Sequence, residues 1–146
     1  MGNFKFKLQK LLDIRINEEE ESKLFYSKAQ NQKTIVEKKL YELEENYRKY
    51  SDLNKEKDTV SKKIAINYLS ILNTHIKDTE KELENKLVEL EKAKKDFIDK
   101  RIKRRSLEVL KEKKILELKK EEERLEQISN DEFALYGYIR KASNLQ

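Results

Sequence analysis

The residues best suited to bind a charged partner form one basic run, Lys100–Arg105, with five bases in six positions. On a helix these side chains point all around the axis and form a positive collar. The collar could pair with Asp13 and residues 18–21 of its own chain, dock on an acidic protein surface, or contact nucleic-acid phosphates. No aromatic side chains are interleaved to stack on bases, and the charge elsewhere is mixed, which weighs against nucleic acid. The other two alternatives stay open.

Groups for catalysis or metal binding are sparse. The single histidine, His75, stands next to an apolar seam, and we expect it to be a packing residue, since metal and hydrolytic sites need several ligands together. No glycine-rich loop could cradle a phosphate, and there is no cysteine. The carboxylates alternate with lysines, as on solvated helical surfaces. We therefore expect a binding protein that is not an enzyme and uses no cofactor or metal.

Composition indicates long helices as the elements that position these residues. The 146 residues include no proline and only two glycines, and 43% are charged. This balance is typical of coiled coils. The 36% of hydrophobic residues suffices for a narrow interhelical seam but not for a thick core. Disorder is the competing interpretation, but the apolar residues recur at helical spacing. We expect an all-α protein.

The first predicted helix covers about residues 4–52. Its apolar residues are spaced alternately by three and four, which is the heptad pattern of a coiled coil. The seam comprises Leu8, Leu12, Ser22, Tyr26, Ala29, Val36, Leu40, Leu43, Tyr47 and Tyr50.

A polar cluster from Ser51 to Ser61 predicts a turn at about residues 53–61, with one unbroken helix as the alternative. A second helix is predicted over about residues 62–140. Ser129 and Glu132 fit a capping box, so we expect a break near residues 129–131 and a short final helix. The second seam comprises Ile64, Tyr68, Ile71, Ile76, Leu83, Leu87, Leu90 and Phe97.

Together the two seams predict one domain, an antiparallel two-helix coiled-coil hairpin with a longer second helix. In such a hairpin the numbers of facing residues add to a nearly constant value. Pairing Leu43 with Tyr68, or Leu40 with Ile71, gives 111, so the turn would centre near residue 56. Residues beyond about 110 would then overhang, and an unpaired apolar tail invites a partner or self-association.

Targeting signals are not evident. The first residues lack the apolar stretch of a signal peptide, and no apolar run approaches the length of a membrane span. The lack of cysteine fits a reducing cytosol.

Three stretches resemble the FliJ family of flagellar export proteins. Residues 4–15, FKFKLQKLLDIR, are similar to the family's F-x-F-[RK]-L-Q-x-[VL]-L-x-[LI]-R opening. Residues 66–68, INY, which lie just past the predicted turn, are the second stretch that resembles the family. Residues 131–134, DEFA, with the later Arg140 and Lys141, are similar to its ending. The virulence secretion counterpart belongs to the same broad group, but the F-x-F opening favours the flagellar version.

This resemblance implies a coiled coil similar to the central stalk of rotary ATPases. It implies a cytoplasmic location at the flagellar base, peripheral to the inner face of the cell membrane, within the type III secretion apparatus. The implied partners are the hexameric export ATPase FliI, whose assembly and activity the stalk promotes, the export gate protein FlhA, and export substrate chaperones. The alternatives are a self-assembling scaffold and, less favoured, a nucleic-acid-binding coiled coil.

The resemblance also implies two contact regions. The gate would be met near the turn, by Val36, Leu40, Leu43, Tyr47 and Ile71. The ATPase ring would be met at the open end and the overhang, by Phe4, Phe6, Leu8, Leu11, Arg101, Arg104, Arg105, Phe133, Leu135 and Ile139.

Overall fold

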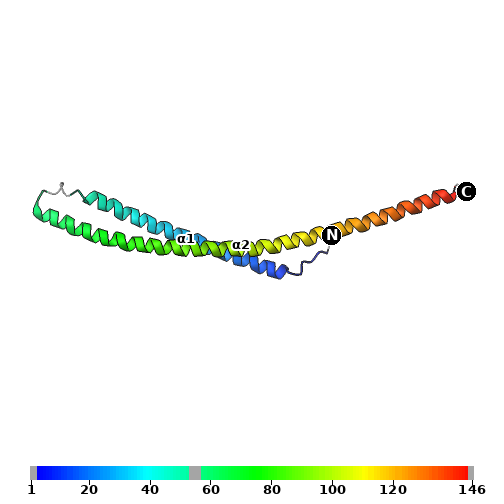
Figure 1. Cartoon of the computed structure of the whole chain (residues 1–146), viewed down its shortest axis with the longest axis horizontal. Helices are drawn as coiled ribbons and strands as arrows, with labels where there is room; N and C mark the ends of the chain where they lie inside the picture. Colours follow the sequence, from blue (N-terminus) through cyan, green and yellow to red (C-terminus); the bar gives the residue numbers. More distant parts are fainter. Residues whose placement is uncertain (1–2, 53–56, 145–146) are drawn as a thin grey trace. The chain divides into compact units, whose positions relative to one another are not determined.

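The computed structural model describes residues 3–52 and 57–144, which form two helices that pack against each other (Figure 1). Helix α1 is Gln9–Tyr50, with 42 residues, and α2 is Thr59–Asn144, with 86 residues. The described residues include no strand. The predicted all-α class and the longer second helix are therefore confirmed.

Helix α2 begins at a capping residue supplied by the predicted polar cluster. The backbone N–H of Ser61 donates to Asp58 Oδ1 at 2.6 Å, and the N–H of Lys62 donates to the Asp58 carbonyl at 3.1 Å. Asp58 is thus an N-cap that satisfies amides left unpaired at the helix start. The helix begins at Thr59 and not near residue 62, because this cap lies within the predicted turn. Residues 53–56 of that turn lie outside the described residues.

Replacing Asp58 with alanine is expected to lower the melting temperature by a few degrees, because the first turn of α2 loses its acceptor. Asp58→Asn keeps an acceptor oxygen and should retain most of the effect. The hydrogen bond from the Ser61 N–H lowers the pKa of Asp58 below its ordinary 3.8. Its contribution is therefore complete above that value and is lost as the pH falls through the lower folded pKa. Thermal circular dichroism of the two variants at pH 7 and pH 2–3 checks this. Equal melting of Asp58→Ala and the parent at pH 7 would contradict it.

Helix α1 begins later than predicted, at Gln9 and not at residue 4. Phe4 and Phe6 are half-buried, whereas the lysines beside them are exposed. This alternation is the period of an extended chain; in a helix, side chains two residues apart point to nearly opposite sides. The first helical contact is the Gln9 N–H donating to the Phe6 carbonyl at 3.1 Å.

Helix α2 is continuous through residues 129–131, so the predicted break and separate final helix are not observed. Asp131 accepts a hydrogen bond from the Gln127 amide at 3.1 Å, one helical turn earlier. A side chain held in this way supports the helix and does not cap a new one. Gly137 also lies within α2 and does not interrupt it.

The contacts divide into two compact units, Asn17–Arg101 and Met1–Ile16 with Ile102–Gln146, where the sequence predicts a single domain. Each unit contains part of α1 and part of α2. They are called the hairpin unit and the terminal unit below, and each is described by itself.

In the hairpin unit the two helices run antiparallel, but their register differs from the prediction. Tyr26 stacks on Phe97 with ring centroids 6.0 Å apart, and Lys39 Nζ lies 3.6 Å from Glu82. The residue numbers add to 123 and 121, not to the 111 of the predicted pairs. The difference exceeds one heptad, and repeating seams can match each other in more than one register, so spacing alone does not select one.

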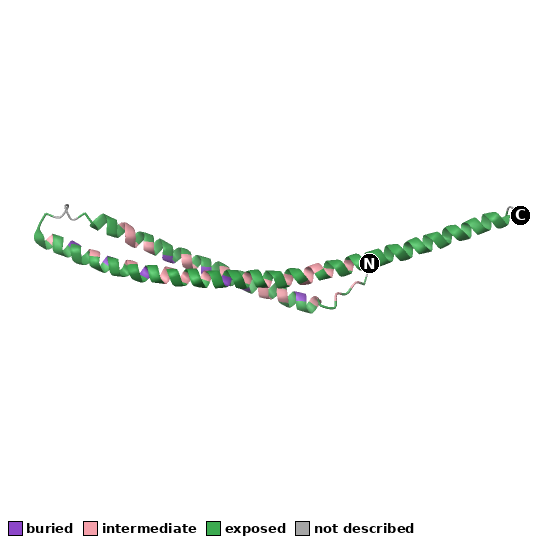
Figure 2. Ribbon diagram, in the orientation of Figure 1, coloured by how far each residue is buried: buried purple, intermediate pink, exposed green. Residues whose placement is uncertain are grey.

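The seam of α1 lies where the sequence predicts it, whereas that of α2 lies one residue later near its start. Ala65 and Leu72 are buried, and the predicted Ile64 and Ile71 are exposed. Leu87 is exposed as well, beside half-buried Lys86. No described side chain in the unit is completely buried, so this is a thin core (Figure 2). Its buried residues are Ser22, Ala29, Val36, Ala65, Leu72, Thr79 and Ala93.

The terminal unit pairs the start of the chain with α2 as far as Leu118. Leu12 is buried, and Lys111 Nζ donates to Gln9 Oε1 at 2.7 Å across the pair. From residue 119 to residue 144 every residue is exposed (Figure 2). This segment is called the overhang below. It begins nine residues later than the predicted residue 110, in the direction that the shifted register requires.

Candidate protein-binding surfaces

The opening of the chain forms an apolar and basic surface in the terminal unit. Phe4 and Phe6 are half-buried, and Leu8 and Leu11 are exposed by 39% and 36%. A hollow of about 460 Å³ lies beside these side chains. It is lined by Phe4, Lys5, Phe6, Lys7, Gln9, Lys10 and Lys111.

Four lysines around two phenylalanine rings give this surface a positive rim, which suits a partner with carboxylates beside apolar side chains.

Two of the five basic side chains of the collar are paired within their own helix. Arg104 Nη1 lies 2.7 Å from Glu108, and Arg105 Nη1 lies 3.2 Å from both Glu108 and Glu112. Partial burial would raise the pKa of Glu108, but the hydrogen bonds from the two arginines outweigh it and lower that pKa. Arginines held by carboxylates are less available to nucleic-acid phosphates. Arg101 is exposed and belongs to the hairpin unit, whereas Arg104 and Arg105 belong to the terminal unit.

The overhang presents the largest exposed apolar side chains of the terminal unit. Among the predicted ring contacts, Phe133 is 82% exposed, and Leu135 and Ile139 are exposed by more than half. The sequence prediction did not include other exposed apolar residues of the same segment, although the heptad spacing already passes through Leu125. These are Leu125, Ile128, Tyr136 and Tyr138.

The predicted gate residues fall into two groups in the hairpin unit. Val36 is buried in the seam, and Leu40 and Leu43 are half-buried. Tyr47 and Ile71 are exposed and can contact a partner without opening the hairpin. The seam residues therefore support the surface from beneath, and a partner that leaves the hairpin closed would contact mainly Ile71 and part of Tyr47.

An apolar groove near the turn was missed by the sequence prediction. Tyr50 meets Tyr68 edge to face, with ring centroids 5.0 Å apart and planes at 84°. With Ser61, Ile64 and Ala65 these rings line a groove of about 490 Å³. The missing signal was a second stripe: residues 65, 69, 72 and 76 have the same spacing as residues 64, 68, 71 and 75. The stripe that contains Ala65 is the buried one, so the larger side chains of Ile64 and Tyr68 remain exposed.

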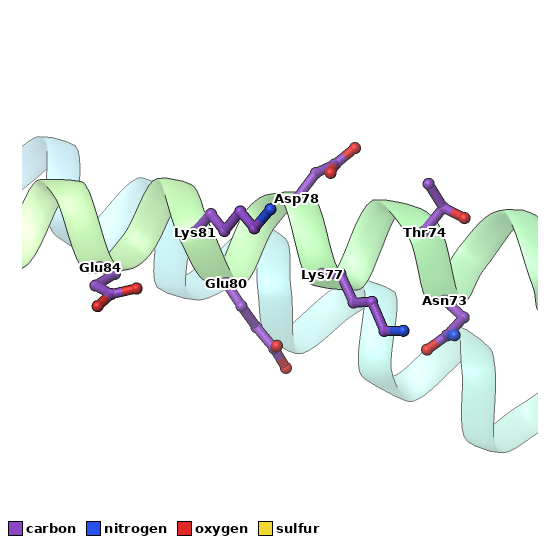
Figure 3. Close-up of a pocket in the computed structure, with 7 residues that line it drawn as sticks. All are labelled: Asn73, Thr74, Lys77, Asp78, Glu80, Lys81 and Glu84. Carbon is purple, nitrogen blue, oxygen red and sulfur yellow. The ribbon is translucent and has the colours of Figure 1, made fainter.

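A polar groove on α2 offers no convergent set of groups. Figure 3 shows Thr74 and Asp78 pointing to one side of the helix and Asn73, Lys77 and Glu80 to the other. His75 is exposed and is not the packing residue that the sequence predicts. Within residues 3–52 and 57–144, no three potential metal ligands cluster. In the same ranges, neither helix has a stretch long and apolar enough to cross a membrane.

Comparison with known families confirms the resemblance found in the sequence. The family model described as flagellar FliJ protein matches residues 4–143, which include the N-terminal segment, both helices and nearly all of the overhang. Searches among curated proteins and among solved structures gave no match. Because the family model covers almost the whole chain, the chain belongs to the FliJ family of flagellar proteins.

Proposed function

We propose that this chain is a non-catalytic stalk of the flagellar type III export apparatus. It binds the hexameric export ATPase, promotes assembly and activity of the ring, and links the ring to the export gate and to substrate chaperones. It acts in the cytoplasm, peripheral to the inner face of the cell membrane at the flagellar base. The family match supports a role in flagellar export, and these finer roles are our proposal.

The observation that best supports ring binding is the composition of the terminal unit. It combines the first residues of the chain, with Phe4 and Phe6, and the far end of α2, with Phe133 and Ile139. Most of the predicted ring contacts thus belong to one compact unit, although they are over a hundred residues apart in sequence. A ring that encloses this unit could bury apolar side chains that the chain itself leaves exposed.

Gate binding is supported by the exposed residues near the turn. Tyr47 and Ile71 lie in the same unit as the groove of Tyr50, Ile64 and Tyr68. Exposed tyrosines suit a reversible contact, because each buries a ring and keeps its hydroxyl in water. We propose that Ile64 and Tyr68 join Tyr47 and Ile71 in the gate contact.

The proposed function is tested by titrating the purified chain into the cognate export ATPase. ATP turnover should rise even when there are fewer copies of the chain than ATPase subunits, because one stalk serves a whole ring. Sedimentation velocity should show a larger fraction of hexameric ATPase. A sample of the same chain that has been unfolded by heat and precipitated controls for effects of buffer additives on ATP turnover. An active ATPase that neither binds the chain nor changes its turnover would exclude the ring-binding proposal.

A further inference from the structure

The overhang contains a coiled-coil seam that no other part of the described chain covers. We propose that a second copy of this chain covers it, so that two overhangs form an antiparallel coiled coil. This inference goes beyond the proposed function and does not rest on it, since it concerns the chain alone.

The overhang is long enough to need a partner. Its 26 residues, 119–144, are all exposed, and at 1.5 Å per residue the segment is about 39 Å long. Helices in proteins owe most of their stability to packing of an amphipathic face. Local support here includes Arg124, which donates to Glu121 at 2.6 and 3.1 Å. Such exposed pairs contribute little, so most of the stabilisation available to this helix lies in an intermolecular contact.

The apolar stripe of the overhang continues the seam of the terminal unit. Leu118 is the last half-buried residue of that seam. Steps of three and four residues lead from it to Leu125, Ile128, Leu135 and Ile139, with Glu121 and Glu132 at the intervening positions. The same face of α2 that packs within the chain is therefore continued on the overhang, where it is exposed.

The spacing of this stripe fits a two-fold antiparallel pair. Positions 121, 125, 128, 132, 135 and 139 lie symmetrically about residue 130. Two copies related by a two-fold axis there would place Leu125 of each chain opposite Leu135 of the other. An isologous interface needs this self-complementarity.

Charge favours the antiparallel over the parallel arrangement. Residues 121–132 contain six carboxylates and one arginine, a net charge of −5, whereas residues 133–144 contain Arg140, Lys141 and no acid. A parallel pair would align the two acidic halves and repel. An antiparallel pair centred on residue 130 sets residues 121–132 opposite residues 128–139 of the other copy, which carry two carboxylates instead of six, and this lowers the repulsion.

Dimerisation of this kind would compete with the proposed ring contact. Leu135 and Ile139 lie on the stripe, so a second copy would cover residues that we assign to the ATPase ring. Self-association would then hold the overhang in a water-soluble pair until the ring displaces one copy.

The first test is sedimentation equilibrium of the full chain over about 1–200 μM. We expect a monomer–dimer equilibrium whose dissociation constant rises at least about 100-fold in Leu125→Glu/Leu135→Glu. Ala134→Glu, which adds one negative charge on a side of the same helix that points away from the stripe, should leave it nearly unchanged. Circular dichroism verifies that all variants remain helical. A chain that stays monomeric throughout, or equal weakening by Ala134→Glu, would overturn the inference.

The second test measures orientation. The chain has no cysteine, so Ser143→Cys gives a single site for a spin label. In the antiparallel pair centred on residue 130, the two labels are 26 residues apart along the helices, about 39 Å. A parallel pair would bring them within about 15 Å, the width of two adjacent helices. A distance near 39 Å supports the proposal, and a short distance overturns it. Failure of either test leaves ring binding untouched, since ATP turnover measures that separately.

Discussion

Replacing Leu72 with alanine is expected to lower the free energy of unfolding by about 2–4 kcal/mol. The same change at the neighbouring Ile71 should alter it by less than about 0.5 kcal/mol. Leu72 is 4% exposed and fills the seam, whereas Ile71 is 56% exposed. The two residues have equal numbers of side-chain carbons. The difference between their losses of unfolding free energy therefore reflects their difference in burial. Urea unfolding followed by circular dichroism measures both values.

The pair of variants also tests where the seam of α2 lies. A seam through Ile71, as the sequence predicts, would reverse the order of the two losses. The thin core makes the total stability small, and Leu72→Ala could unfold at room temperature. In that case Leu72→Val and Ile71→Val give the same comparison with a smaller loss of unfolding free energy. Equal losses at the two positions would contradict the burial described here.

Replacing both Phe4 and Phe6 with alanine is expected to raise the concentration of chain needed for half-maximal ATPase stimulation by about 10–100-fold. The two rings are half-buried in the terminal unit and line a hollow with Lys5, Lys7 and Lys111. Their removal deletes the aromatic part of the surface that we assign to the ring. The maximum turnover at saturating chain should stay near that of the parent, because the remaining contacts are intact.

Phe25→Ala is the matched control for this double variant. Phe25 is also a phenylalanine, 65% exposed, but it lies on α1 in the hairpin unit. It should leave ATPase stimulation unchanged. Because Phe4 and Phe6 precede α1, the melting temperature of the double variant should stay close to that of the parent. Unchanged potency in a folded double variant would remove the N-terminal segment from the proposed ring contact.

Sequence periodicity was sufficient to predict the helices and the α1 seam. In α1 the apolar spacing has a single consistent solution, and burial of Leu12, Ala29 and Val36 follows it. In α2 two neighbouring stripes have the same spacing, and the larger side chains of Ile64 and Tyr68 made the wrong one attractive. The stripe that contains Ala65 and Leu72 is the buried one, which the spacing alone does not show.

The register and the contact surfaces needed the structure. Heptad seams can match each other in more than one register, so the seams alone could not choose between the predicted sum of 111 and the observed sums of 121 and 123. Contacts between particular rings, such as Tyr26 on Phe97, distinguish the two registers. The same ambiguity explains why Val36 was predicted as a contact residue although it is buried. Residues 4–8 were predicted to be helical because their extended alternation was not recognised.

The thin core has a thermodynamic consequence. Unfolding changes the heat capacity in proportion to the apolar surface newly exposed to water. In this chain the buried seam residues are mostly small, and many large apolar side chains are already in water in the folded state. The heat-capacity increment per residue should therefore fall well below that of a globular domain. Its stability curve should be correspondingly flat, so that cooling strengthens the hairpin only slightly and warming weakens it over a wide range of temperature.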